Sequence, residues 1–123
     1  MKRTIALLFL LLAAAAAAHA QLYDFTLYNY SGQDIDSVCL APVDTGSWSD
    51  NLLDYYIFDG DYGDIELDTL TEDLCESSGI YEFDLLVGFD DGTELTWSDI
   101  DLLSVYEIYI YLDDDGEIQA EGY

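Results

Sequence analysis

Acidic side chains are the residues of this sequence best placed to do chemistry, and they are densest in two short segments. Asp59, Asp61 and Asp64 are interspersed with two glycines that let the backbone bend, and Asp113 and Asp115 precede a third glycine. Hard carboxylate oxygens are the ligands of Ca²⁺, which takes roughly six to eight of them. Both segments are therefore predicted as weak calcium sites. Neither matches the EF-hand loop, and the alternative is a solvent-facing acidic turn.

Paired carboxylates could also act as the acid and base of a glycosidase. The chain holds 27 Asp and Glu residues, so pairs at glycosidase separation arise by chance over most of its surface. A catalytic acid needs its pKa raised by burial, and no acid here lies inside an apolar run. Glu82 and Asp84, for example, fall on the polar face of their predicted strand. A carbohydrate-active enzyme is therefore kept only as an alternative.

Basic side chains are confined to the first twenty residues, where Lys2, Arg3 and His19 lie. The rest of the chain cannot neutralise phosphates, which excludes nucleic acid as a partner. It also lacks a His or Lys base for a nucleophile and a His ligand for zinc. We therefore predict a binding, interaction or cell-envelope module without catalysis, and no cofactor apart from Ca²⁺. The uncompensated negative charge favours cations or a basic protein surface as partners. A high-salt habitat and mimicry of a polyanion are alternative explanations of the acidic composition.

Tyrosines are the second unusual feature, since the chain holds 11 of them. Tyr109 and Tyr111 alternate with apolar residues, so they should share the face of a strand that also carries Glu107. Aromatic rings beside carboxylates can stack on sugars or on cationic groups. Tyr109 and Tyr111 are therefore predicted to contact a ligand. The alternative is that they only cover a thinly buried sheet, because strands are rich in tyrosine.

The first twenty residues are predicted to be a cleaved signal peptide. Lys2 and Arg3 form a basic start, residues 5–18 are an uncharged apolar run, and Ala18-His19-Ala20 fits the small-x-small cleavage pattern. The apolar run is shorter than the roughly 20 residues of a membrane span. We therefore expect cleavage before Gln21, and a secreted or periplasmic protein without a membrane span afterwards.

Cys39 and Cys75 are the only cysteines, and both follow the predicted leader. An even number of cysteines in an exported domain favours a disulfide. Such a bond would stabilise the fold by roughly 4 kcal/mol on the chain-entropy model. Two buried free thiols are the alternative.

Alternation of apolar and polar residues predicts β-strands along residues 21–112. The alternating segments are residues 23–27, 35–40, 64–68, 81–89, 95–97 and 105–112. Residues 90–93 predict a hairpin turn because Asp-Gly supplies a positive φ. No helix of useful length is expected, apart from one helical turn at residues 48–53. The pattern predicts an all-β fold, a small antiparallel β-sandwich of about six strands, with an open barrel as the alternative.

The predicted core lies on the apolar face of these strands, and residues 113–123 are predicted to be an acidic, frayed tail. The expected core residues are Phe25, Leu27, Ile65, Leu67, Phe83, Leu85, Val87, Leu95, Trp97, Ile108 and Ile110.

The chain resembles a family of small exported bacterial β-rich proteins. Their pattern is Asn-x-Thr-Gly, Trp-x-x-Asp-Leu-Leu, Tyr-Asp-Leu-x-Val-x-Phe-x-Asp-Gly and Trp-x-x-Ile-Asp-Leu, which residues 29–32, 48–53, 81–92 and 97–102 approximate. Ser31 stands where the family commonly has Thr, and Leu85-Leu86 where it often has Leu-Arg. The resemblance implies a single β-rich domain of unestablished activity, and it carries over no catalytic residue.

Overall fold

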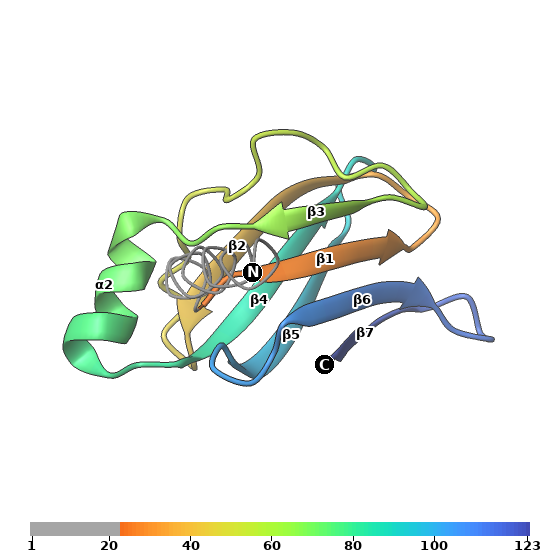
Figure 1. Cartoon of the computed structure of the whole chain (residues 1–123). Coiled ribbons are helices and arrows are strands. Elements are labelled where there is room, and N and C mark those ends of the chain that lie inside the picture. Colours follow the sequence, from red (N-terminus) through yellow and green to blue (C-terminus); the bar gives the residue numbers. More distant parts are fainter. Residues whose placement is uncertain (1–22) are drawn as a thin grey trace, which may run out of the picture.

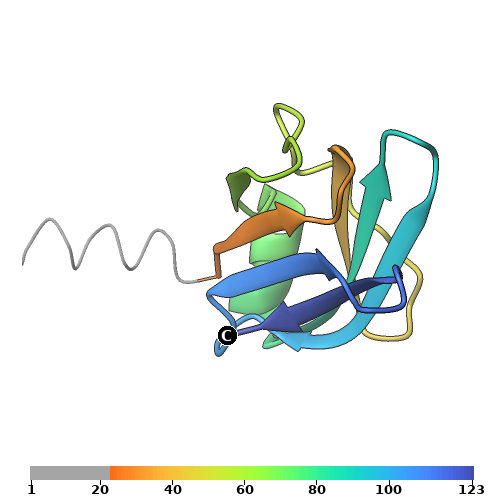
Figure 2. The ribbon, with the colours of Figure 1, turned by 90° about the vertical axis from the view of Figure 1, so that its right-hand side faces the viewer.

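Two β-sheets packed face to face form the protein in the computed structural model, which describes residues 23–123 (Figures 1 and 2). The strands are β1 (Phe25–Tyr30), β2 (Ile35–Pro42), β3 (Tyr62–Ile65), β4 (Glu82–Phe89), β5 (Glu94–Asp101), β6 (Glu107–Leu112) and β7 (Ile118–Gly122). One sheet has the order β3-β1-β6-β7 and the other the order β2-β4-β5. The predicted small all-β sandwich is confirmed, and the strands of residues 23–123 form no closed barrel. The predicted signal peptide lies outside the described residues.

The strand pairs are antiparallel except for β1 and β6, which are parallel with Tyr28 opposite Tyr109. Alternation along a strand shows which residues face the core, but it carries no information about the direction of the neighbouring strand. The parallel pair was for this reason not predicted. It matters for function because it brings residues 28–30 beside residues 109–111.

The core lies between the two sheets and consists of the apolar faces of their strands. Of the predicted core, these residues are buried: Phe25, Leu27, Ile65, Phe83, Leu85, Val87, Ile108 and Ile110. Leu67, Leu95 and Trp97 are half-buried and pack against its margin. The hairpin predicted at residues 90–93 is present, with Gly92 at φ 87° and the Asp91 carboxylate accepting hydrogen bonds from Thr93.

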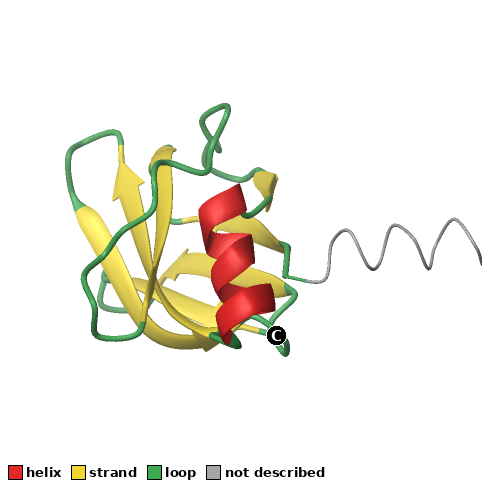
Figure 3. Ribbon diagram, turned by 90° about the vertical axis from the view of Figure 1, so that its left-hand side faces the viewer, coloured by secondary structure: helices red, strands yellow, loops and turns green. Residues whose placement is uncertain are grey.

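A helix, α2 (Thr69–Ser78), crosses the end of the sandwich where β3 ends and β4 begins (Figures 1 and 3). Asp68 caps it by accepting a 2.9 Å hydrogen bond from the Thr71 amide, and Gly79 ends it in the left-handed conformation. Only Thr71 and Cys75 are buried along it. The helix was not predicted because two buried positions give no apolar stripe. No helix in residues 23–123 has the length and apolar character that a membrane crossing requires.

The predicted C-terminal tail is a strand, which corrects the boundary placed at residue 112. The Asp113 carboxylate accepts hydrogen bonds from the amides of Asp115 and Glu117 and so closes a hairpin turn. β7 then pairs antiparallel with β6 and packs Ile118 and Ala120 against the core. A short edge strand with one large apolar residue was read as a tail because its alternation is faint.

Gly122 is required where β7 passes beneath an indole ring. A β-carbon at this position would lie 2.6 Å from Cη2 of Trp97 and 3.3 Å from Cγ1 of Val105. Gly122→Ala is therefore expected to lower the free energy of unfolding by about 1–3 kcal/mol through overpacking. Urea denaturation measures this effect, and Trp97→Phe, which removes the obstructing ring, should restore part of the loss in the double variant. A loss that is the same in both backgrounds would contradict this contact.

The segment at residues 48–53 is extended rather than a helical turn, which corrects a second expectation. Its backbone runs along the edge of β2, where the amides of Ser49 and Leu52 donate to the carbonyls of Leu40 and Val38 at 2.8 Å each. The side chain of Asn51 accepts a further hydrogen bond from the Val38 amide. The segment thereby covers the free edge of β2, which would otherwise be open to pairing with another chain.

The predicted disulfide is not formed, since Cys39 and Cys75 are both free. Cys39 lies between Val38 and Leu40, which face the core, so strand alternation turns it to the outer face of its sheet. Cys75 lies on the buried side of α2, and burial raises the pKa of its thiol to about 11. The spacing of two cysteines in a sequence does not show which face of its strand or helix each one occupies.

Candidate functional site

Tyrosines and glutamates gather on the outer face of the sheet β3-β1-β6-β7. We call this surface the tyrosine face, and it consists of Tyr28, Tyr30, Tyr62, Glu107, Tyr109, Tyr111, Glu121 and Tyr123. It exists because strand alternation that buries Ile108 and Ile110 turns Tyr109 and Tyr111 outward. The prediction that these two tyrosines share a face with Glu107 is confirmed.

The tyrosine rings of this face pack against one another. Tyr28 and Tyr109, neighbours across the parallel pair, stack with ring centroids 4.5 Å apart and a 6° angle between their planes. The ring of Tyr62 lies beside that of Tyr28 on the side away from Tyr109, with 5.6 Å between the ring centroids. The ring of Tyr30 is nearly parallel to that of Tyr109, with 6.4 Å between their centroids and 13° between their planes. The ring of Tyr123 meets that of Tyr109 edge-on, with 82° between their planes. Rings held by several neighbours form a preordered surface, which lowers the entropic cost of binding a ligand.

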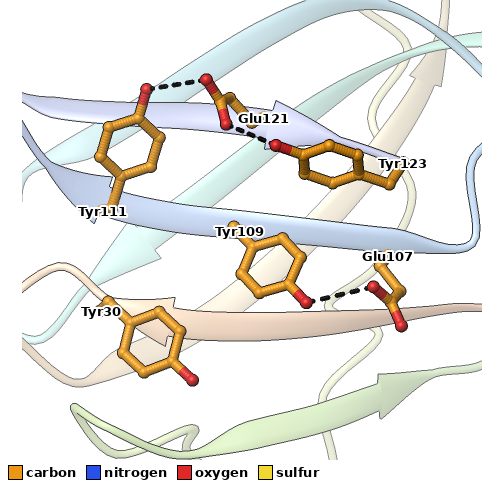
Figure 4. Close-up of a pocket in the computed structure, with 6 residues that line it drawn as sticks. All are labelled: Tyr30, Glu107, Tyr109, Tyr111, Glu121 and Tyr123. Atoms are coloured by element: carbon orange, nitrogen blue, oxygen red, sulfur yellow. Dashed lines mark hydrogen bonds between the residues drawn. The ribbon is translucent and has the colours of Figure 1, made fainter.

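Each glutamate of the face is held by tyrosine hydroxyl groups (Figure 4). Tyr109 donates a 3.1 Å hydrogen bond to Oε2 of Glu107. Tyr111 and Tyr123 donate to the two oxygens of Glu121, at 3.4 Å and 2.8 Å respectively. No Lys, Arg or His occurs in residues 23–123, so neither carboxylate has a cationic partner within the described chain.

These side chains surround a depression with a volume of about 670 Å³. Its lining consists only of tyrosines and glutamates, namely Tyr30, Glu107, Tyr109, Tyr111, Glu121 and Tyr123. Tyr30 and Tyr123 are 50% and 63% exposed, so their rings are open to a ligand. The surface offers aromatic faces, hydroxyl groups and negative charge. Chemically it suits stacking on a sugar ring or attraction of a cation.

Three of these tyrosines are expected to weaken the fold as the solution becomes alkaline. Burial raises the pKa of Tyr109 and Tyr111 above 10.0, and the hydrogen bond to Glu121 does so for Tyr123. A raised folded-state pKa adds stability that is complete below the unfolded pKa and is lost as the pH rises through the folded one. The free energy of unfolding should therefore fall above pH 10.

Urea unfolding at about pH 9 and about pH 11 measures this loss. Tyr109→Phe/Tyr123→Phe should lose less stability than the unchanged protein between the two conditions, because it has two fewer hydroxyls to ionise. An equal loss in both proteins would show that the tyrosine face is not responsible.

The predicted calcium ligands of the first acidic segment are each used by a hydrogen bond within the protein. The carboxylate of Asp59 accepts from the Gly32 amide, that of Asp61 from the Tyr62 amide, and that of Asp64 from the Thr26 hydroxyl. In the second segment, both oxygens of Asp113 are engaged by the turn before β7 and by Gln119.

Residues 23–123 contain no group of three or more Asp, Glu, Cys or His side chains arranged to hold a metal ion. Asp115 contributes its amide to the turn before β7. The calcium sites therefore stay a prediction without geometric support.

Asp84 is a buried carboxylate, 8% exposed, although its strand pattern predicted a polar face. Its neighbours Phe83 and Leu85 both face the core, so alternation leaves Asp84 on the outer face of the sheet. There it is covered by the backbone at Asp44 and at Asp99, the latter lying where the register of β4 and β5 shifts. Its two oxygens accept hydrogen bonds from the amides of Asp44 and Asp99, both of which have a positive φ. Asp84 lines neither the tyrosine depression nor three smaller ones that the described residues form, and its two hydrogen bonds hold two unusual backbone positions.

Asp24 is the carboxylate whose surroundings come nearest to those of a general acid. Burial raises its pKa, opposed by a hydrogen bond from the Leu67 amide and aided by the nearby Glu66. It lines a depression of about 240 Å³ together with Asp64 and Glu66. A raised carboxyl pKa alone does not make a catalytic pair, since structural burial produces the same shift.

Sequence reasoning missed half of the residues that line the depression, and it also missed Tyr28 and Tyr62 beside them. Tyr30 lay outside the predicted strands, Glu121 and Tyr123 were assigned to the tail, and the parallel pair that brings Tyr28 to Tyr109 was not expected. One signal was present, because Gln119, Glu121 and Tyr123 alternate with smaller residues.

Comparison with known proteins supports the fold alone. No protein-family model and no curated protein matches the chain, so the resemblance to the exported bacterial family stays a prediction. Among solved structures, the chain is similar to one described as the NMR structure of the protein from Eubacterium rectale. The similarity has a TM-score of 0.51 at 16% identity and covers 80% of this chain and 85% of that chain.

Proposed function

We propose that this protein is a non-catalytic binding module, exported from the cytoplasm, whose tyrosine face contacts the ligand. The observation that carries the proposal is the depression of about 670 Å³, whose lining is made only of tyrosines and glutamates. Ligand sites commonly have volumes of roughly 300–1,000 Å³ and aromatic linings with a few polar groups. Export rests on the basic, apolar and small-x-small segments of residues 1–20.

A binding role is preferred to an enzymatic one because of the chemistry that the chain offers. From Gln21 onward it has carboxylates but no Lys, Arg or His to serve as a base, an oxyanion donor or a nucleophile activator. Asp84, the most deeply buried acid of residues 23–123, is held by two amides and lines none of the four depressions named above.

The test is calorimetric titration of the purified protein with three probes of different chemistry: cellohexaose, choline and an arginine-containing octapeptide. At least one should bind, and Tyr30→Ala/Tyr123→Ala should weaken that binding by about tenfold, because each lost ring face contributes about 0.5–1 kcal/mol. Both residues are at least half exposed, so the variant should still fold.

Tyr55→Ala/Tyr106→Ala is the matched control, since it removes two tyrosines that are 86% and 60% exposed away from the depression. Equal weakening in both variants, or no binding of any probe, would contradict the proposal.

A further inference from the structure

We propose that the tyrosine face binds an extended segment of a partner polypeptide with arginines at alternate positions. This inference rests on the proposed function and specifies the chemistry of its ligand. It follows from three features of the face: uncompensated carboxylates, the diagonal placement of these carboxylates, and exposed tyrosine rings beside them.

A cation that pairs with the carboxylates of the face must come from outside the described chain. Glu107 and Glu121 receive hydrogen bonds only from tyrosine hydroxyls, and residues 23–123 supply no positive side chain. Oε1 of Glu107 accepts no hydrogen bond at all from these residues. A neutral sugar would leave both charges unpaired, whereas a cationic ligand would neutralise them in a partly dry, aromatic setting.

The spacing of the two glutamates fits an extended peptide. Glu107 lies opposite Tyr123, with which it exchanges two backbone hydrogen bonds of 2.8 and 3.0 Å, and Tyr109 lies opposite Glu121. Glu107 and Glu121 are therefore diagonal neighbours, whose Cβ atoms are about 7 Å apart in an antiparallel pair. Alternate residues of an extended chain are also about 7 Å apart. An Arg-x-Arg segment would thus present one guanidinium to each carboxylate.

Arginine fits this surface better than lysine does. A guanidinium is planar, so it can lie on a tyrosine ring while its N–H groups bind a carboxylate in pairs, which an ammonium cannot do. Each glutamate has a tyrosine ring next to it: the Tyr109 hydroxyl donates a hydrogen bond to Glu107, and those of Tyr111 and Tyr123 donate to Glu121. Figure 4 shows these side chains gathered over β6 and β7, with Tyr30 on the adjacent β1.

The experiment compares two isomeric octapeptides that carry two arginines among threonines, one with the arginines at alternate positions and one with them adjacent. Both peptides have the same charge, so general attraction to an acidic surface would give them equal affinities. At constant ionic strength, the alternating isomer should bind at least about fivefold more tightly. Replacement of its arginines by lysines should weaken binding by about fivefold.

Two charge-matched variants locate the contact. Glu107→Gln/Glu121→Gln keeps one acceptor oxygen at each position but removes both charges, and it should weaken binding of the alternating isomer by about tenfold. Asp73→Asn/Glu76→Gln removes two exposed charges from α2 and should change binding by less than about twofold.

The outcomes separate this inference from the proposed function. Equal affinity of the two isomers, or an equal effect of the two variants, would overturn the inference in favour of general attraction to an acidic surface. Binding of cellohexaose that is sensitive to Tyr30→Ala/Tyr123→Ala, without binding of the alternating isomer, would overturn the inference but support the binding module. Binding of the alternating isomer that depends on Glu107, Glu121 and the arginine spacing supports both.

Discussion

Phe83→Ala is expected to lower the free energy of unfolding by about 3–5 kcal/mol, because it removes a large side chain from a close-packed core. Phe83 is fully buried on β4, between Pro42 of β2 and Ile100 of β5. A small domain is stable by only about 5–15 kcal/mol, so much of the population should unfold under mild denaturant.

Urea denaturation followed by circular dichroism measures this effect. Phe58→Ala is the matched control, since Phe58 is 59% exposed and its removal should change stability by no more than about 0.5 kcal/mol. Similar losses in the two variants would contradict the position of the core between the sheets.

Asp84→Ala is expected to cost about 2–4 kcal/mol, because it leaves the amides of Asp44 and Asp99 without their acceptor. The two amides bind different oxygens of the carboxylate, at 3.2 and 3.1 Å. Asp84→Asn, which keeps only one acceptor oxygen, should therefore cost about half as much.

Asp114→Ala controls for the loss of one negative charge, since Asp114 is exposed in the turn before β7. Relief of repulsion in so acidic a chain should make this control neutral or slightly stabilising. If Asp84→Ala were as harmless in urea denaturation as Asp114→Ala, Asp84 would have no structural role, and its burial would need another explanation.

The sequence was sufficient to predict what depends on neighbouring residues along the chain. Alternation placed Phe83, Leu85 and Val87 in the core and Tyr109 and Tyr111 outside it, and Asp-Gly marked the turn between β4 and β5. These features follow from the two-residue period of a strand and from the backbone freedom of glycine.

What could not be predicted depends on contacts between distant parts of the chain. Three features are of this kind: the burial of Asp84 beneath the backbone at Asp44 and Asp99, the parallel pair β1–β6, and the docking of β7 beside β6. The depression lies where β1, β6 and β7 meet, so only half of its lining could be expected. α2 was missed for a different reason: only Thr71 and Cys75 are buried along it, so its apolar side is too small to form a pattern.

The location of bound ligand on the protein tests most directly whether the tyrosine face is a binding surface. Two-dimensional ¹H–¹⁵N NMR spectra, recorded during titration with the octapeptide that carries alternating arginines, report this location residue by residue. The expected result is a set of shifted amides concentrated in β1, β6 and β7, around Tyr30, Tyr109 and Glu121 (Figure 4). Shifts spread evenly over the acidic surface, or centred on α2, would contradict it.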